Sequence, residues 1–317
     1  MNFTIRHVDY DGLDLVRLTD ENSGTTIGLL PGYGATLHEF LVRQKDGALF
    51  NVIDNYHSAA ELKKEMTRSF KGPKLSPFPC RIPDGTYQYD NRQYHFRHLF
   101  SDGTAIHGLL YDKPFTVTAE TADGAAMVAM EYDYNNIDPG YPFRYTCLVR
   151  YELHPDNDLE VTTTVTNTGD TTIPIADGWH PYWRLGGSAN DWQLQFHSEA
   201  IVDFDERLVP TGGLTEYGEF ASARPLGDTF LDNCFVLKPE LVSAACELYN
   251  PATGLRVAFF PDASYPYLQL YTPPTRASIA VENLSGAPDC FNNKMGLILL
   301  QPGHSQIFTV RYTVSVG

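Results

Sequence analysis

Leu159–Asn167 reads Leu-Glu-Val-Thr-Thr-Thr-Val-Thr-Asn, and the segment Ile173–Leu185 reads Ile-Pro-Ile-Ala-Asp-Gly-Trp-His-Pro-Tyr-Trp-Arg-Leu. The first segment alternates apolar with polar residues and is rich in β-branched side chains, which is typical of a half-buried strand. Thr168–Asp170 then supplies a turn, so we expect a second strand to follow it. These two neighbouring strands predict sheet structure at the centre of the chain.

His180 lies in the second strand, among three aromatic residues and a proline. Successive side chains of a strand point to opposite faces, which predicts that His180 shares its face with the small residues Ala176 and Gly178. Those small residues would leave space above the sheet beside the imidazole. For His180 taken alone, a histidine hydrogen-bonded inside an aromatic core is the commoner interpretation, so the rest of the chain has to decide.

The sequence on both sides of this centre also has the pattern of strands. Phe143–Leu153 alternates and is expected to form a hairpin with Leu159–Asn167, and short apolar segments recur up to the C-terminus. Ser58, with Glu61 three residues later, opens the one convincing helix, Glu61–Arg68. No linker, repeat or low-complexity tract interrupts the sequence. We therefore predict an all-β protein, a large antiparallel sandwich that forms a single domain over residues 1–317.

Composition narrows the classes of partner. The 317 residues include 23 Lys plus Arg against 39 Asp plus Glu, a net charge of −16, which repels nucleic acid and anionic membrane surfaces. The N-terminus has no apolar targeting segment, and no stretch is long and apolar enough to span a membrane. Five scattered cysteines without Cys-x-x-Cys spacing are typical of reduced core thiols. We expect a soluble, cytoplasmic protein.

Glu282 is a second residue with an unusual position. In the strand Ser278–Glu282, alternation places Glu282 on one face with the small residues Ser278 and Ala280. Glu282 alone could simply face water. Together, however, Glu282 and His180 are two ionisable groups that each stand over small residues of a strand, which predicts a shared concave site.

Three further residues are candidates for this site. Arg81 lies between two prolines in a short apolar loop, where it is expected to be held in position, and His107 precedes a glycine that permits close approach of the backbone. Asp232 stands immediately before an apolar strand and, taken alone, is typical of a turn. These residues offer no local metal-ligand spacing, and Gly-x-Ser-x-Gly is absent. A carboxylate and an imidazole facing one pocket instead suit proton transfer in two directions.

Five motifs, in this order, carry a resemblance to the aldose 1-epimerase (galactose mutarotase) family: Pro79-Cys-Arg-Ile-Pro-Asp-Gly-Thr-Tyr87, His107-Gly108, Gly178-Trp-His-Pro-Tyr-Trp183, Leu231-Asp-Asn-Cys-Phe235 and Val281-Glu-Asn283. The resemblance covers nearly the whole chain. It implies a β-supersandwich with few short helices that interconverts the α and β anomers of a free sugar without metal or organic cofactor. It would make Glu282 the base and His180 the acid, with Arg81, His107 and Asp232 binding the sugar hydroxyls. We expect a monomer or homodimer.

Four positions differ from the pattern that the family commonly shows. Cys80 stands in place of Asn, Leu109 in place of a second glycine, Trp179 in place of Asn, and Asn283 in place of Pro or a hydroxyl residue. These differences leave the acid and the base in place but leave the identity of the sugar open. The net charge and the lack of a basic cluster favour an unphosphorylated sugar.

Two other functions compete with that of a mutarotase. A non-catalytic carbohydrate-binding or sugar-sensing protein could have the same pocket, but binding alone does not need both His180 and Glu282. A glycoside hydrolase or polysaccharide lyase is the other alternative. A hydrolase would need a second carboxylate opposite Glu282, for which Asp232 is the only nominee.

Overall fold

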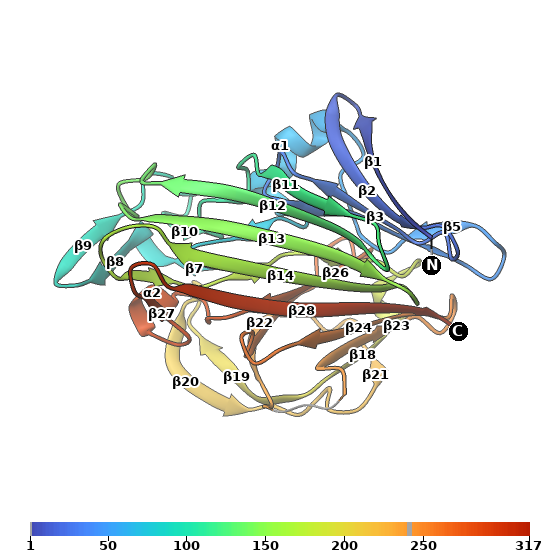
Figure 1. Cartoon of the computed structure of the whole chain (residues 1–317). Helices are drawn as coiled ribbons and strands as arrows, with labels where there is room; N and C mark the ends of the chain where they lie inside the picture. The colour runs from blue at the N-terminus through green and yellow to red at the C-terminus, as the bar shows by residue number, and fades with distance from the viewer. Residues whose placement is uncertain (1, 240–242) are drawn as a thin grey trace.

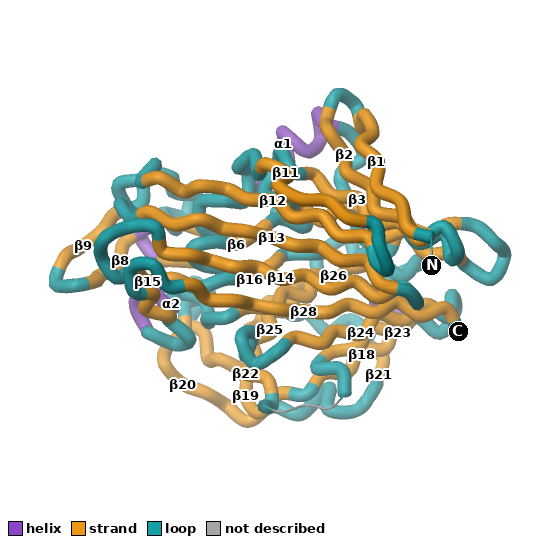
Figure 2. Tube along the Cα trace, in the orientation of Figure 1, coloured by secondary structure: helices purple, strands orange, loops and turns teal. Residues whose placement is uncertain are grey.

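The computed structural model describes residues 2–239 and 243–317, and β-strands dominate its regular structure (Figure 1, Figure 2). The predicted all-β class is confirmed, since the pairings within the two largest sheets are antiparallel. Among the described residues the helical segments are short: α1 (Ala59–Ser69), α2 (Cys290–Asn293) and the 3₁₀ turns η1 (Pro83–Gly85) and η2 (Ala189–Asp191).

The largest sheet has nine strands and contains the hairpin predicted at the centre of the sequence. Its two strands pair from Tyr145 opposite Asn167 to His154 opposite Asp158, and burial alternates along both because one face packs into the interior. In spatial order the sheet consists of β11 (Thr116–Thr121), β12 (Ala126–Asn135), β13 (Arg144–His154), β14 (Asp158–Asn167), β28 (Ser305–Val316), β24 (Leu255–Pro261), β23 (Cys246–Tyr249), β18 (Gln193–Phe196) and β21 (Arg224–Pro225).

A second sheet, of eight strands, lies behind the first in the view of Figure 1. Its path is β20 (Pro210–Glu216), β19 (Ser198–Phe204), β22 (Asp232–Leu237), β25 (Tyr267–Tyr271), β26 (Ile279–Leu284), β16 (Gly178–Trp179) and β6 (Lys74–Leu75), and β17 (Tyr182–Trp183) also pairs with β26. The strand predicted around Glu282 is therefore β26, which lies in the middle of this sheet.

The segment predicted as a single strand after the turn at residues 168–170 is broken into short pieces. Gly178 pairs with Leu284 and Tyr182 pairs with Ala280, so both pieces follow one register along β26, but the ladder is interrupted between them at Pro181. Proline has no backbone N–H to donate to a ladder, which accounts for the break. The expectation of one continuous strand is wrong here, although the register continues across the gap.

The remaining strands form smaller sheets: β1 (Phe3–Tyr10), β2 (Leu13–Asp20), β3 (Thr26–Leu30), β4 (Thr36–Arg43) and β5 (Leu49–Asn51) in one, and the pairs β7 (Arg81–Ile82) with β10 (Ala105–Ile106), β8 (Thr86–Tyr89) with β9 (Arg92–His95), and β15 (Ile173–Ile175) with β27 (Ile298–Leu300). Helix α1 follows the five-stranded sheet. Its predicted N-terminal signal is confirmed, because the Ser58 hydroxyl accepts the Glu61 N–H at 3.0 Å.

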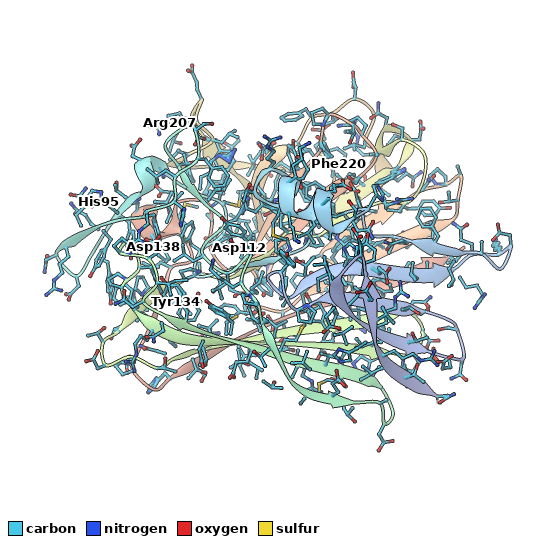
Figure 3. All side chains as sticks on the ribbon, turned by 90° about the horizontal axis from the view of Figure 1, so that it is seen from above. His95, Asp112, Tyr134, Asp138, Arg207 and Phe220 are labelled. Atoms are coloured by element: carbon cyan, nitrogen blue, oxygen red, sulfur yellow. The ribbon has the colours of Figure 1, made fainter. Side chains whose placement is uncertain are left out.

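Side chains fill the space between the sheets, as Figure 3 shows from above. One continuous cluster of buried hydrophobic side chains draws on the five-, eight- and nine-stranded sheets. All five cysteines are free and buried, as expected for core thiols. Among the described helices, none is long and apolar enough to cross a membrane.

Candidate active site

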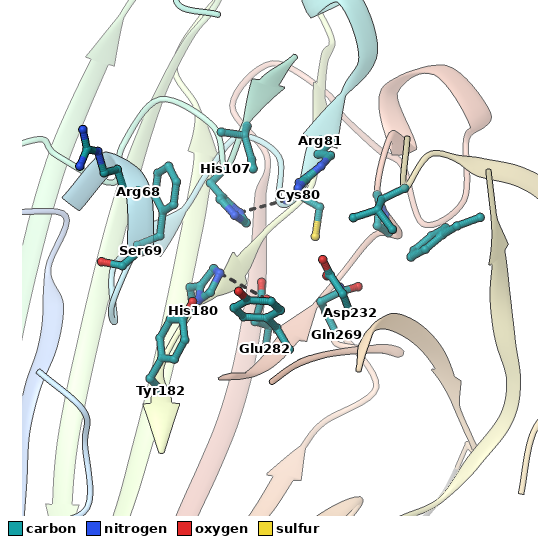
Figure 4. Close-up of a pocket in the computed structure, with 16 residues that line it drawn as sticks. Arg68, Ser69, Cys80, Arg81, His107, His180, Tyr182, Asp232, Gln269 and Glu282 are labelled. Atoms are coloured by element: carbon teal, nitrogen blue, oxygen red, sulfur yellow. Dashed lines mark hydrogen bonds and ion pairs between the residues drawn. The ribbon is translucent and has the colours of Figure 1, made fainter. Parts of the chain in front are cut away.

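His180 and Glu282 form a cross-strand pair on one face of the eight-stranded sheet. The pairings on either side of the interrupted ladder place these two residues directly opposite each other, and opposite residues of antiparallel strands point to the same face. His180 Nε2 lies 3.4 Å from Glu282 Oε1, and the two side chains are only 7% and 3% exposed (Figure 4). The fold thus brings together an imidazole and a carboxyl group from two distant segments.

Burial controls the protonation of this pair. It lowers the pKa of His180 to about 4, so the neutral imidazole is favoured at neutral pH. It raises the pKa of Glu282 well above the usual range; the nearby charge of Asp232 raises that pKa further, and the charge of Arg81 opposes it. Between the two pKa values the pair holds a single proton. His180 Nδ1 and Glu282 Oε2 are buried without a hydrogen-bond partner among the described residues, as expected where a ligand supplies one.

Gln269 extends the pair into a row across the sheet, and sequence reasoning missed it. It lies opposite Glu282 on one side and opposite Cys234 on the other. Its Nε2 donates a hydrogen bond to Asp232 Oδ1 at 2.9 Å, while its Oε1 is buried and has no partner among the described residues. The available signal was a single amide inside the apolar strand Tyr267–Tyr271, but the sequence does not show which residues lie opposite that amide.

In Figure 4, Asp232 lies beside Gln269 on the side away from His180, and Arg81 lies above them, next to Cys80. Burial raises the pKa of Asp232, and the charge of Arg81 opposes the shift. The sequence predicted that Arg81 lies in a short loop. In the structure it begins β7, where it pairs with Ile106 of β10. This pairing holds Arg81 close to His107, the next residue after Ile106, so two candidates from separate loops become neighbours.

His107 is a neutral hydrogen-bond donor. Its Nδ1 accepts the backbone N–H of Cys80 at 3.3 Å, and its own backbone N–H donates to the Cys80 carbonyl at 2.8 Å. Burial, aided by the nearby His180 and Arg81, lowers the pKa of His107 well below its usual range, so its one ring proton resides on Nε2. The residue after His107 has to be glycine. A Cβ at Gly108 would lie 2.3 Å from the Ser76 carbonyl oxygen, and the backbone φ of Gly108 is +75°, which other residues rarely adopt.

All five candidates predicted from the sequence line a single cavity of about 190 Å³: Arg81, His107, His180, Asp232 and Glu282. The aromatic walls of this cavity were not predicted. Phe70 caps the C-terminal end of α1 in a left-handed conformation, and its ring centroid lies 4.6 Å from that of His107. Tyr182 stacks on His180 with centroids 5.1 Å apart. These rings exclude water from both imidazoles, which strengthens their interactions with a bound polar ligand.

The predicted floor of small residues is wrong. A Cβ at Gly178 would lie 2.6 Å from Leu284 Cδ2 and 3.3 Å from Pro79 Cβ, so the space beside this glycine is filled by packing. Ser278 and Ala280 are fully buried and do not line the cavity. The cavity is instead bounded by residues of α1, β7 and β10 together with residues of the sheet.

His107, His180 and Glu282 also present donor atoms within 4.8 Å of one another, a separation that a metal ion could bridge. The tautomer of His107 opposes this use, because its Nε2 carries the proton while Cys80 holds its Nδ1. Ligation through Nε2 would require the ring to lose that hydrogen bond. The arrangement favours hydrogen bonding to oxygen over metal ligation.

Comparison with known proteins is decisive about the family. The family model described as aldose 1-epimerase matches residues 14–313. The chain belongs to the aldose 1-epimerase family. It is 28% identical over 301 residues to the uncharacterized protein YihR of Escherichia coli K12, covering 91% of this chain and 93% of that one. The galactose mutarotase of Homo sapiens is 24% identical over 187 residues, which are 57% of this chain and 52% of that protein.

Solved structures confirm the family's fold for this chain. A galactose mutarotase-like protein from Clostridium acetobutylicum superposes with a TM-score of 0.87 at 18% identity, over 100% of this chain and 99% of that one. The galactose 1-epimerase from Lactobacillus acidophilus NCFM gives a TM-score of 0.82 at 22% identity, again over 100% and 99%. The predicted β-supersandwich of the aldose 1-epimerases is therefore correct.

Of the four departures from the family pattern, Cys80 alone lines the candidate active site. Leu109 lines a different hollow, and the Trp179 and Asn283 side chains are buried on the sheet face opposite His180 and Glu282. Burial raises the pKa of Cys80 well above the usual range, so this thiol is neutral. A neutral thiol where an amide is common removes one hydrogen-bonding group from the wall of the pocket.

Proposed function

We propose that this chain is an aldose 1-epimerase that interconverts the α and β anomers of a free aldose without a cofactor. The observation that supports this most is the buried cross-strand pair of Glu282 and His180, 3.4 Å apart and facing a polar pocket. The C1 hydroxyl and the ring oxygen of a pyranose are bonded to the same carbon. A carboxyl group and an imidazole in contact can therefore each serve one of these two oxygens.

In the proposed reaction, Glu282 takes the proton of the C1 hydroxyl while the bond from C1 to the ring oxygen breaks. The electron pair of that bond stays on the ring oxygen, which takes a proton from His180, and an open-chain aldehyde results. Rotation about the C1–C2 bond presents the other face of the carbonyl. Glu282 then returns its proton to the carbonyl oxygen, His180 recovers its proton from the attacking hydroxyl, and the ring closes as the other anomer.

The pair holds one proton at every stage of this cycle. Ring opening only moves that proton from His180 to Glu282 by way of the sugar. The neutral pair that burial favours has the same proton count as the ion pair that starts ring opening. Hydrogen bonds from the closed sugar and the charge of Arg81 favour the ionised carboxylate once the substrate is bound.

Arg81, His107 and Asp232 are proposed to hold the sugar hydroxyls. Arg81 and His107 offer N–H donors, and Asp232, fixed through Gln269, offers an acceptor. Donors and an acceptor arranged around a ring hold it in one orientation. That orientation keeps C1 over the acid–base pair through ring opening, rotation and closure.

Two alternatives remain testable in one experiment. A carbohydrate-binding or sugar-sensing protein would bind free sugars without accelerating anomer exchange, and a glycoside hydrolase would release reducing ends from glycosides. Magnetisation-exchange NMR on a panel of free aldoses measures anomer exchange directly, and the same samples with aryl glycosides report hydrolysis. Exchange that is accelerated by the wild-type protein and lost in Glu282→Gln would support the mutarotase. Binding without exchange would overturn it.

A further inference from the structure

A fully buried ion pair lies on the opposite face of the sheet from the candidate active site. Lys74 of β6 and Asp177, next to β16, have side chains with no exposed surface, and Lys74 Nζ donates to Asp177 Oδ1 at 2.5 Å and to the Gly178 carbonyl at 3.0 Å. Lys74 Nζ also lies 4.1 Å from the centre of the Trp179 ring. Asp177 is three residues before His180, and the proposed mechanism uses neither member of the pair.

The hydrogen bonds of Asp177 connect the strand of His180 to the strand of Glu282. Its backbone N–H donates to the Ser285 hydroxyl at 2.8 Å, and the Ser285 N–H returns a bond to the Asp177 carbonyl at 2.9 Å. Its carboxylate also accepts the Tyr265 hydroxyl at 2.6 Å, close to the start of β25. Ser285 is three residues after Glu282, so Asp177 is fixed to three neighbouring segments of the site.

Stability alone does not explain such a pair. Burying two charges away from water is costly, and well-packed apolar residues of similar volume are often neutral or stabilising replacements. Burial lowers the pKa of Lys74 and raises that of Asp177, and each charge opposes the shift of the other. A hydrogen-bonded ion pair does, however, fix direction and spacing more narrowly than apolar packing does.

The sheet ladder is weakened at Pro181, so a second set of bonds that fixes the two strands has a role beside His180. Pro181 has no N–H to donate, so on this side of His180 the two strands keep only the bond in which the Pro181 carbonyl accepts the Val281 N–H at 3.2 Å. We propose that the Lys74–Asp177 pair, with Ser285, is a positioning device that sets the separation of His180 from Glu282 for the proposed reaction. This inference rests on the proposed function, but the imidazole itself offers a second readout that does not depend on turnover.

The test uses the full-length protein with the paired variant Lys74→Met/Asp177→Leu, which removes both charges and leaves neither ion unpaired. Lys74→Met/Asp177→Asn is the conservative variant, because its amide still accepts the Tyr265 hydroxyl. Arg17→Met/Glu39→Leu removes a partly buried ion pair in the five-stranded sheet and serves as the matched control. For each variant we would measure thermal unfolding, kcat and KM for anomer exchange, and the NMR titration of the ¹⁵N-labelled His180 ring.

We expect the Met/Leu variant to fold and to shift the His180 titration. Its kcat should fall at least about tenfold, which corresponds to about 1.4 kcal/mol of activation free energy, with a smaller change in KM. The Asn variant should recover part of the lost kcat, and the control variant should have the kcat and the His180 titration of the wild type. Wild-type kcat and an unchanged His180 titration in a folded Met/Leu variant would overturn the inference.

Two other outcomes are also informative. If the wild type itself exchanged no anomers, the proposed function would fail, and the His180 titration would still decide whether the pair positions the imidazole. If the Met/Leu variant does not fold, the Asn variant decides the question by the same two readouts: a lower kcat with a shifted titration supports the inference, and wild-type values of both overturn it.

Discussion

Glu282→Gln should greatly slow anomer exchange and stabilise the protein at neutral pH at the same time. The amide keeps the shape of the carboxyl group but cannot take the C1 proton. A general base contributes ~10²–10⁴-fold, or about 2.7–5.4 kcal/mol of transition-state stabilisation, so kcat should fall by at least about 100-fold. KM should change much less, because Arg81, His107 and Asp232 remain to bind the sugar.

The gain in stability follows from the raised pKa of Glu282. The unfolded chain ionises this carboxyl above its ordinary pKa of 4.5, whereas the folded chain resists ionisation, so the wild type loses stability as pH rises from 4.5 through the folded-state pKa. Each pKa unit between the two states corresponds to about 1.4 kcal/mol. The variant has no ionisable group at this position, so its gain in stability over the wild type should be absent below pH 4.5 and should grow as the pH rises.

Thermal unfolding at several pH values, together with exchange NMR, measures both effects. Glu199→Gln, a change at an exposed carboxyl group, is the control and should alter neither quantity. Near wild-type exchange by Glu282→Gln would show that the carboxylate is not the base. Equal unfolding temperatures of variant and wild type at pH 4.5 and pH 8 would show that burial does not destabilise its ionised form.

The same geometry predicts how other changes affect exchange. Arg81→Lys and Asp232→Asn should raise KM and lower kcat in steady-state exchange kinetics, because both groups orient the ring; an effect on kcat alone would contradict a binding role. The pH profile of kcat/KM should be bell-shaped, with limbs that belong to the coupled pair: activity falls towards pH 4, where His180 takes a second proton, and falls again above the raised pKa of Glu282. Exhaustive chelation should leave exchange unchanged, and recovery of a lost activity on adding a metal would refute the assignment. Free hexoses should exchange faster than their 6-phosphates, and a reversed preference would direct attention to Arg68 and Arg81 in the pocket wall.

Local patterns in the sequence were enough to predict the elements that local forces decide. The hairpin of β13 and β14 follows from alternation and a polar turn, and the start of α1 follows from Ser58 and Glu61. The break at Pro181 also had a local signal, the missing N–H of proline, which the prediction of a continuous strand overlooked.

Properties of the site that depend on distant segments were harder to predict. Gln269 belongs to the site because of its register opposite Glu282, and register between strands depends on the packing of the whole sheet. The floor predicted beside Gly178 failed because Pro79 and Leu284, both remote in sequence, occupy that space. His180 and Glu282 stood out because ionisable groups inside apolar strands are costly, but each became a site candidate only together with the other. Asp232, taken alone, is typical of a turn, so its place in the site, like the binding roles of Arg81 and His107, rested on the resemblance to the aldose 1-epimerases.

The central claim is that His180 and Glu282 act together in a single proton-transfer step. Its most direct test compares the wild type with His180→Asn, Glu282→Gln and the double variant in anomer-exchange NMR on whichever free aldose the wild type turns over fastest. We predict that each single change costs at least about 100-fold and that the double change costs little more than the worse single one, since neither group can act without the other. Losses that multiply in the double variant, or a wild type that binds free aldoses yet accelerates exchange of none of them, would contradict the claim.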